Sequence, residues 1–300
     1  NEPPRYEPQN TNERPISETT RRLLLHWFRH EPHSVGRAPK TTLFRYWPHQ
    51  RRLVESFIYL YEALGIRRTE ELFRLCELEA LGPQRDPWTK LGGQLATGSG
   101  KTKMMSLLIA WAYLNAVREG EEHLGIGRHS VLIAPGLFVR DRLCSDFSPP
   151  DHSPSVFFTD PVVPPEFDRE WDLKVYSPTS CPLQLDPEEG VLIITNYHQL
   201  LRTRDDGPDL SVMSDPERQM DLLFESGDPE RLEAISTPLI ERFAQSRGLL
   251  VLNDEAHHVW DETGHAQFEH KAREKAKLTG ASASDAATAM AWIRCLRRLN

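Results

Sequence analysis

The sequence predicts an α/β protein whose mainly parallel β-sheet is covered by helices on both faces. Three short apolar runs, 131–134, 191–194 and 249–252, have the length and composition of buried strands. They alternate with longer segments in which apolar residues recur at helical spacing, as expected for crossovers between parallel strands. An N-terminal helical extension over 1–40 and an inserted helical layer at 202–247 add to this core.

The composition limits the class of protein. The chain has 300 residues and a formal net charge of −8, from 36 Lys and Arg against 44 Asp and Glu. This balance argues against a protein that coats nucleic acid by bulk charge, but it allows a local basic groove. No apolar run approaches the length of a membrane span, and the first residues lack the apolar core of a signal peptide. We therefore expect a cytoplasmic protein.

The cysteines predict neither a disulfide framework nor a zinc site. They are widely separated, and no Cys-x-x-Cys pair occurs. We expect reduced, structural thiols at Cys76, Cys144, Cys181 and Cys295.

The first 80 residues predict an arm followed by three helices. Residues 1–15 are polar and rich in Pro, which is typical of an extended arm. Ser17 is expected to cap a helix that ends by Pro32, and a basic linker should follow at 33–40. An aromatic cluster then opens a second helix, and 69–80 has a third helical pattern. The apolar faces of the first two helices carry Leu23, Leu24, Trp27, Phe28, Leu53, Phe57, Leu60 and Leu64.

Three further segments complete the chain. Residues 147–170 are rich in Pro and predict an irregular surface excursion. A short strand is expected at 173–176. Residues 261–283 are polar, and a final helix should begin at Ser284.

A glycine-rich segment at 96–102 has the pattern of a phosphate-binding loop. The run 91–95 is expected to enter it as a strand, and the apolar segment from Met104 to leave it as a helix. Glycines here permit positive φ, so that consecutive N–H groups converge on a phosphate at the helix N-terminus. Lys101 is placed to reach the β and γ phosphates, and Thr102 to ligate Mg²⁺. The predicted nucleotide contacts are Thr97, Gly98, Ser99, Gly100, Lys101 and Thr102.

The strict form of this loop has Gly five residues before Gly100, where this chain has Leu95. The alternative is a glycine-rich turn that precedes a lysine by chance. The small residues, Lys101, Thr102 and both flanking elements all favour the phosphate loop.

Two adjacent carboxylates follow the last predicted strand. Asp254 and Glu255 stand directly beyond the run 249–252. A nucleotide hydrolase needs one carboxylate on Mg²⁺ and a second on the attacking water, both at the end of a rigid strand. Asp254 and Glu255 are predicted to take these roles in that order.

Two other chemistries compete with this interpretation. Asp254 could join nearby histidines in a transition-metal site, but no His-Glu-x-x-His pattern and no cysteine supports one. A Ser/His/Asp hydrolase lacks its Gly-x-Ser-x-Gly elbow. The histidines concerned are His257, His258, His265 and His270.

Two motifs resemble those of superfamily 2 helicases. Ala-Thr-Gly-Ser-Gly-Lys-Thr at 96–102 is similar to motif I, and Asp-Glu-Ala-His at 254–257 to motif II. The resemblance covers about residues 44–260. With Thr-Asn-Tyr-His at 195–198 and a second histidine after motif II, it looks closest to the restriction subunit of type III restriction enzymes and related phage-defence proteins.

The resemblance implies the first RecA-like lobe, at 41–300, of an ATP- and Mg²⁺-dependent helicase or translocase on duplex DNA. A second RecA-like lobe, a nuclease domain and a methyltransferase subunit are the further partners it implies. Its motifs fall at 44–50 for the adenine-binding segment, 96–102 for motif I, 133–142 for motif Ia, 194–198 for motif Ib or Ic, and 254–257 for motif II.

Adenine contacts are implied for Tyr46 and Gln50, because in this superfamily an aromatic followed by Gln precedes motif I. A Gln amide can pair with a donor and an acceptor of the base, and an aromatic can stack on its face. In the alternative, Tyr46 and Trp47 belong to the core and Gln50 only begins a helix. His257 would couple the nucleotide site to the second lobe.

Nucleic-acid contacts are implied at the ends of two strands. Arginine is suited to phosphate by its planar fork of donors. Alternatives are a strand ended by Pro with a solvated basic helix, and a helix N-cap by Thr195 or Asn196. The implied contacts are Pro135, Arg140, Arg142, Thr195, Asn196 and His198.

Motif III and the motifs of the second lobe are missing from the sequence. We therefore expect this chain to be one lobe of a larger machine, which binds nucleotide but hydrolyses it slowly, with little stimulation by DNA. The other hypotheses are an RNA helicase of the DEAD/DEAH class and a regulatory nucleotide-binding module without turnover.

Overall fold

A computed structural model describes residues 15–37, 40–76, 90–96, 98–150, 153–178, 180–196, 199–200 and 238–254. At its centre is a four-stranded sheet in the order β4-β5-β3-β6, with every neighbouring pair parallel. Its strands are β3 (His129–Ala134), β4 (Leu173–Tyr176), β5 (Gly190–Asn196) and β6 (Leu249–Asn253). The prediction of an α/β fold with a parallel sheet is confirmed.

The two faces of the sheet belong to two cores, because successive side chains of a strand point to opposite faces. Leu132 and Ile194 face a large core that includes α4 (Lys101–Arg118), α6 (Leu137–Phe147) and α7 (Val156–Thr159). Val131 and Ile193 face a smaller core closed by Leu185 and by the 3₁₀ turn η5 (Leu239–Phe243). Within the described ranges, the long helices therefore cover one face.

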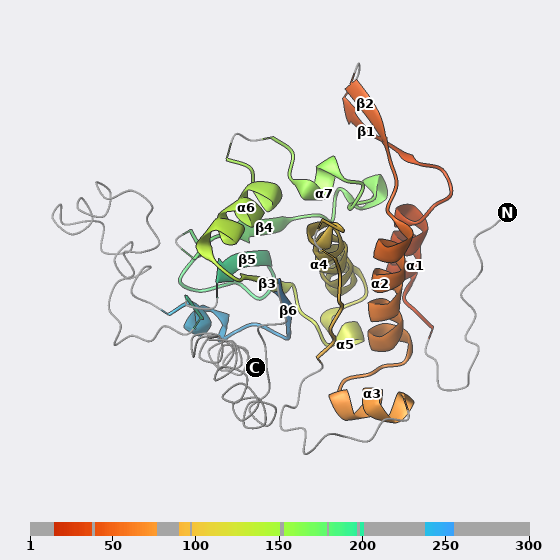
Figure 1. The fold of residues 1–300 in the computed structure, drawn as a ribbon. Helices are drawn as coiled ribbons and strands as arrows, with labels where there is room; N and C mark the ends of the chain where they lie inside the picture. Colours follow the sequence, from red (N-terminus) through yellow and green to blue (C-terminus); the bar gives the residue numbers. More distant parts are fainter. Residues whose placement is uncertain are drawn as a thin grey trace, which may run out of the picture.

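Helix α4 lies between the sheet and the pair formed by α1 (Glu18–Trp27) and α2 (Pro48–Ile58) (Figure 1). Every residue from Met104 to Ala116 is buried. A helix with layers on both sides has to be apolar around its circumference, and this sequence meets that requirement.

Helix α2 carries a polar residue at each end of its buried face. The helix continues into a π turn, η1 (Tyr59–Ala63), and its buried residues recur every four positions as Gln50, Val54, Ile58 and Glu62, with Ala63 also buried beside the last. Gln50 faces the glycine-rich loop, and Glu62 faces α1 and α4.

Glu62 accepts hydrogen bonds from three helices. Its carboxylate lies 2.7 Å from the Ser17 N–H, 2.7 Å from the Thr20 hydroxyl and 3.1 Å from the Trp111 indole nitrogen. His123 of α5 (Glu121–Leu124) adds a contact of 2.9 Å. A buried carboxylate with all its donors in place stabilises one arrangement of these helices.

The expected basic linker at 33–40 is wrong. Strands β1 (His33–Arg37) and β2 (Lys40–Phe44) form an antiparallel hairpin that projects from the body of the protein (Figure 1). The domain boundary expected at residue 40 thus falls inside this hairpin. Thr41, Thr42 and Phe44 are β-branched or aromatic residues suited to strands, and the Phe44 ring packs 4.9 Å from that of Tyr46.

The expected surface excursion at 147–170 is also wrong for much of its length. Phe157, Val162 and Phe167 are buried in the main core, and the segment forms α7 and the 3₁₀ turn η2 (Pro165–Phe167). The Trp27 indole donates to the Val162 carbonyl at 2.7 Å. The apolar residues between the prolines outweigh the turn signals.

The strand expected at 91–95 is not formed, since residues 90–96 have no regular secondary structure. Gly92 and Gly93 are poor strand formers and leave no side chain to pack.

Helix α3 (Thr69–Leu75) agrees with the pattern at 69–80 as far as it is described. The arm, residues 201–237 and the region after residue 254 lie outside the described residues. None of the described helices combines the length and apolar character needed to cross a bilayer.

We predict that Glu62→Ala lowers the free energy of unfolding by about 3 kcal/mol, because it leaves several buried donors without an acceptor. Glu166→Ala is the control, since its carboxylate is exposed and pairs with Arg22 at 3.6 Å; it should change stability by less than about 0.5 kcal/mol. Urea denaturation measures both. Equal effects of the two substitutions would contradict this role of Glu62.

Candidate functional site

The glycine-rich loop leads into α4 through two glycines at positive φ, as the sequence predicts. Gly98 and Gly100 have φ of 78° and 84°, which other residues rarely adopt. The Ser99 N–H donates to the Ala96 carbonyl at 3.2 Å, and α4 begins at Lys101 with Gly100 as its N-cap. Thr97 lies outside the described residues. The loop therefore delivers a helix N-terminus without a side-chain cap, where an anion can bind.

Lys101 and Asp254 meet at the carboxyl end of the sheet, as the sequence predicts. The Lys101 Nζ lies 3.7 Å from the Asp254 Oδ1. Asp254 directly follows β6, and its N–H donates to the Ile133 carbonyl of β3 at 3.0 Å. The backbone of Asp254 is thereby fixed to the central part of the sheet.

The Asp254 carboxylate has unused capacity. The residue is only 6% exposed, and no hydrogen bond reaches its Oδ1 from the described part of the chain. Thr102, half-buried, follows Lys101 in the first turn of α4. A buried carboxylate oxygen and a hydroxyl are hard oxygen donors of the kind that Mg²⁺ prefers. The donor set fits the predicted Mg²⁺ site.

Other predicted parts of this site lie outside the described residues. These are Glu255 and His257, and the histidines at 258, 265 and 270. Within the described ranges, no three His, Cys, Asp or Glu side chains gather into a possible metal site.

Two side chains of α2 contact the loop. The Gln50 Nε2 and the His49 Nε2 lie 2.8 Å and 3.0 Å from the Ser99 carbonyl oxygen. The Gln50 Oε1 accepts from the Trp47 N–H at 2.9 Å. Gln50 therefore joins the start of α2 to the loop, and whether its amide also contacts adenine stays a prediction.

Tyr46 lies in the core, which agrees with the alternative interpretation of this residue. It is 4% exposed, with edge-on contacts to Phe28 and Phe44. Its hydroxyl has no hydrogen-bond partner among the described residues, and burial raises its pKa well above the usual value. In this structure its ring has no accessible face for stacking on a base.

Trp47 is the exposed aromatic at this position. Its side chain is 66% exposed, and its ring packs edge-on against His49 at 5.7 Å. From the sequence, Trp47 is expected only in the alternative interpretation, which places it in the core with Tyr46. Its place directly before Pro48, at the start of a helix, was the signal that it could face solvent.

The implied nucleic-acid contacts are mostly buried. Arg140 is 9% exposed and bonds to its neighbour Asp141 at 2.7 Å, whereas Arg142 is exposed. Thr195 and Asn196 are almost fully buried, and Asn196 accepts from the Gln199 N–H at 3.1 Å. The N-cap alternative is thus the geometry observed for Asn196. Pro135 is half-buried, and His198 lies outside the described residues.

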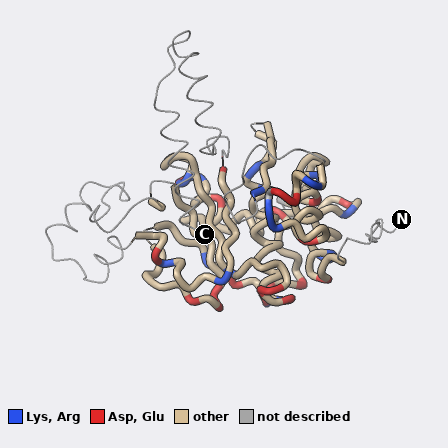
Figure 2. Tube along the Cα trace, turned by 90° about the horizontal axis from the view of Figure 1, so that it is seen from below, with Lys and Arg blue, Asp and Glu red and all other residues tan. Residues whose placement is uncertain are grey.

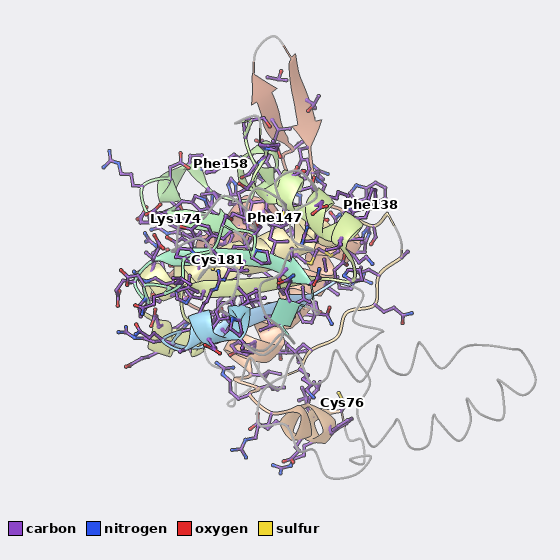
Figure 3. The ribbon with its side chains drawn as sticks, turned by 90° about the vertical axis from the view of Figure 1, so that its left-hand side faces the viewer. Cys76, Phe138, Phe147, Phe158, Lys174 and Cys181 are labelled. Atoms are coloured by element: carbon purple, nitrogen blue, oxygen red, sulfur yellow. The ribbon has the colours of Figure 1, made fainter. Side chains whose placement is uncertain are left out.

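Phe138 is a further exposed residue at the carboxyl end of the sheet, and no motif in the sequence indicates it. It is 84% exposed in the first turn of α6, whereas Phe147 of the same helix is buried (Figure 3). Basic and acidic residues are interspersed along the described trace (Figure 2). A nucleic-acid contact here would thus be local.

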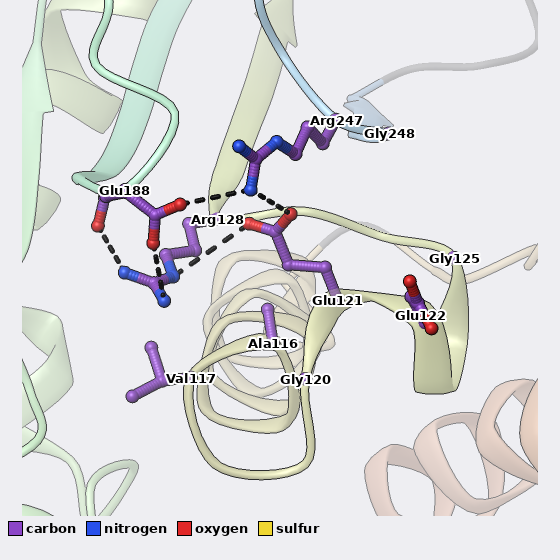
Figure 4. A pocket seen from close by; sticks show the side chains of 10 residues that line it. All are labelled: Ala116, Val117, Gly120, Glu121, Glu122, Gly125, Arg128, Glu188, Arg247 and Gly248. Carbon is purple, nitrogen blue, oxygen red and sulfur yellow. Dashed lines mark hydrogen bonds and ion pairs between the residues drawn. The ribbon is translucent and has the colours of Figure 1, made fainter.

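A cavity of about 690 Å³ lies at the opposite, amino end of the strands (Figure 4). Arg128 precedes β3, Glu188 precedes β5 and Arg247 precedes β6. Both arginines pair with Glu188, at 3.1 Å and 3.0 Å, and both lie within 4 Å of Glu121. The charges compensate one another, so this cluster ties the strand starts together and lies apart from Lys101 and Asp254.

Comparison with protein-family models, with curated protein sequences and with solved structures found no match to this chain. The fold and the geometry of the loop are therefore the observations on which a functional proposal has to rest.

We predict that Tyr46→Ala lowers the free energy of unfolding by about 3 kcal/mol, because it removes a buried ring from the core. Tyr46→Phe should be neutral or stabilising, since it removes only a hydroxyl without a partner. Trp47→Ala, at an exposed position, should change stability by less than about 0.5 kcal/mol. Thermal and urea denaturation of the three variants measure these changes. A loss of stability for Tyr46→Ala as small as that for Trp47→Ala would place Tyr46 outside the core.

Proposed function

We propose that this protein binds ATP with Mg²⁺ at the loop 96–102 and hydrolyses it as the first RecA-like lobe of a superfamily 2 helicase or translocase. One observation carries the proposal, the 3.7 Å approach of Lys101 to Asp254. These residues come from the two segments that resemble motifs I and II. A chance glycine-rich turn would not bring its lysine to a buried carboxylate at the end of a parallel strand.

The chemistry of the loop suits a polyphosphate. The N-terminus of α4 supplies N–H donors and positive potential, and Lys101 adds a cation beside them. Asp254 and Thr102 would hold Mg²⁺, which when bound neutralises phosphate charge and favours attack at the γ phosphorus. The ion pair with Asp254 also positions the Lys101 ammonium beside the loop.

Glu255 directly follows Asp254 and is the proposed general base. It would orient the attacking water and accept its proton as the new oxygen–phosphorus bond forms and the bond from the γ phosphorus to the β–γ bridging oxygen breaks, with ADP as the leaving group. The exposed ring of Trp47 is available to stack on the nucleobase. It lies close to His49, which contacts the loop. We therefore assign base stacking to Trp47 instead of Tyr46.

Duplex DNA is the nucleic acid that we propose the protein binds and moves along, and the exposed residues Arg142 and Phe138 are its proposed local contacts. The second lobe, a nuclease domain and a methyltransferase subunit are proposed partners by resemblance alone. The burial of Arg140, Thr195 and Asn196 favours a second candidate, a nucleotide-binding regulatory module that does not respond to DNA. ATPase rates measured with and without duplex DNA, in this chain and in any longer form, distinguish the two.

We predict that Lys101→Ala weakens ATP binding roughly 10- to 150-fold, the range for a lost charge-assisted contact. Lys174→Ala is the control, because it removes the same charge from an exposed position of β4 (Figure 3); there Lys174 pairs with Glu189. Isothermal titration with Mg²⁺-ATP measures both. Unchanged affinity of Lys101→Ala would overturn the assignment of the loop.

We predict that Glu255→Gln keeps ATP affinity and lowers the hydrolysis rate by at least about 100-fold, because the carboxylate acts only on the way to the transition state. Titration of ATP and a phosphate-release assay separate binding from turnover. Near-normal turnover of this variant would show that another group is the base.

A further inference from the structure

The Ser99 carbonyl oxygen accepts two side-chain hydrogen bonds from one turn of α2. Gln50 Nε2 lies 2.8 Å from it, and His49 Nε2 lies 3.0 Å from it. A carbonyl oxygen has two lone pairs and donates nothing, so both contacts use its full capacity. The His49 ring therefore carries its proton on Nε2 in this arrangement.

This pair of contacts fixes the direction of the next amide group. A trans peptide unit is planar, and its C=O and N–H point in opposite directions. Because the Ser99 carbonyl points to α2, the Gly100 N–H points away from α2, on the other side of the loop. Within the described residues this N–H makes no hydrogen bond, whereas the Gly100 carbonyl accepts from Lys103 and Met104.

Gln50 is itself held in place. Gln50 is only 4% exposed, and its Oε1 accepts a hydrogen bond from the Trp47 N–H. A Cβ at residue 100 would lie 2.4 Å from the Gln50 Nε2, so only glycine lets the amide come this close. The positive φ of Gly100 imposes the same requirement.

We propose that His49 and Gln50 are positioning residues for the phosphate chain and not readers of the base. By holding the Ser99 carbonyl, they orient the Gly100 N–H for an anion before any ligand arrives. This inference rests on the proposed function. It identifies the part of the ligand that the two residues sense, so their effect is the same for any nucleoside triphosphate and for inorganic tripolyphosphate.

The test is the affinity of ATP, GTP and tripolyphosphate, each with Mg²⁺, for the wild-type chain and three variants. Gln50→Leu removes both the acceptor and the donor of the side-chain amide at similar volume, and His49→Phe removes a donor but keeps a ring. His49→Gln, which can still donate, is the matched control. We expect Gln50→Leu and His49→Phe to weaken all three ligands in parallel, by about fivefold each, the factor for one net hydrogen bond. His49→Gln should lose less.

A loss confined to ATP, with unchanged tripolyphosphate affinity, would overturn the inference and make Gln50 a reader of adenine. No change with any ligand would overturn it as well. If the wild-type chain binds none of the three, the proposed function itself fails, and the inference falls with it.

Hydrogen exchange of the loop gives a readout without ligand or activity. Loss of the hydrogen bond from Gln50 to the Ser99 carbonyl should speed amide exchange at 98–104 in Gln50→Leu, relative to His49→Gln. The amides of β3 and β5 should keep their protection from exchange. Faster exchange in the sheet as well would mean that the variant is globally destabilised; His49→Phe then provides the test. Unchanged exchange at 98–104 in both variants would contradict a positioning role.

Discussion

The burial of α4 is the constraint on which the rest of the structure depends. Its residues from Met104 to Ala116 are buried because the sheet covers one side and α1 and α2 cover the other. In a close-packed interior such a helix cannot rotate or slide without opening cavities. The start of α4 is thus fixed relative to β6, and Lys101 meets Asp254 there.

Sequence alone predicts the parts of the fold and the site that local pattern determines. The strands at 131–134, 191–194 and 249–252 are short aliphatic runs, which favour a parallel sheet; the first two are fully buried there, and the third is half-buried. The sequence also predicts the approach of Lys101 to Asp254, although the strand expected before the loop is not formed and Lys101 reaches Asp254 because α4 packs against β6. Glycine at positive φ is equally local, since few other residues tolerate it.

The remaining features depend on neighbours that no local pattern specifies. Tyr46 and Trp47 are adjacent aromatics, yet one is buried and the other exposed, because Phe28 at the end of α1 and Phe44 at the end of β2 pack against Tyr46. The buried part of 147–170 depends in the same way on distant residues, such as Trp27, whose indole bonds to the Val162 carbonyl. The burial of Arg140 could have been predicted from the sequence. Residues two apart on a helix face different directions, so Arg140 and Arg142 cannot share one exposed face.

Helix α2 connects these levels of the structure. Its buried face begins with Gln50 at the loop and ends with Glu62 among α1, α4 and α5, with Val54 and Ile58 packed between them. Both polar ends hold groups that belong to α4 or precede it directly. Since α4 cannot move alone, a polar contact at each end of α2 leaves the two helices a single relative position. The orientation of the Ser99–Gly100 peptide is therefore set by packing that extends back to Ser17, well outside the glycine-rich loop.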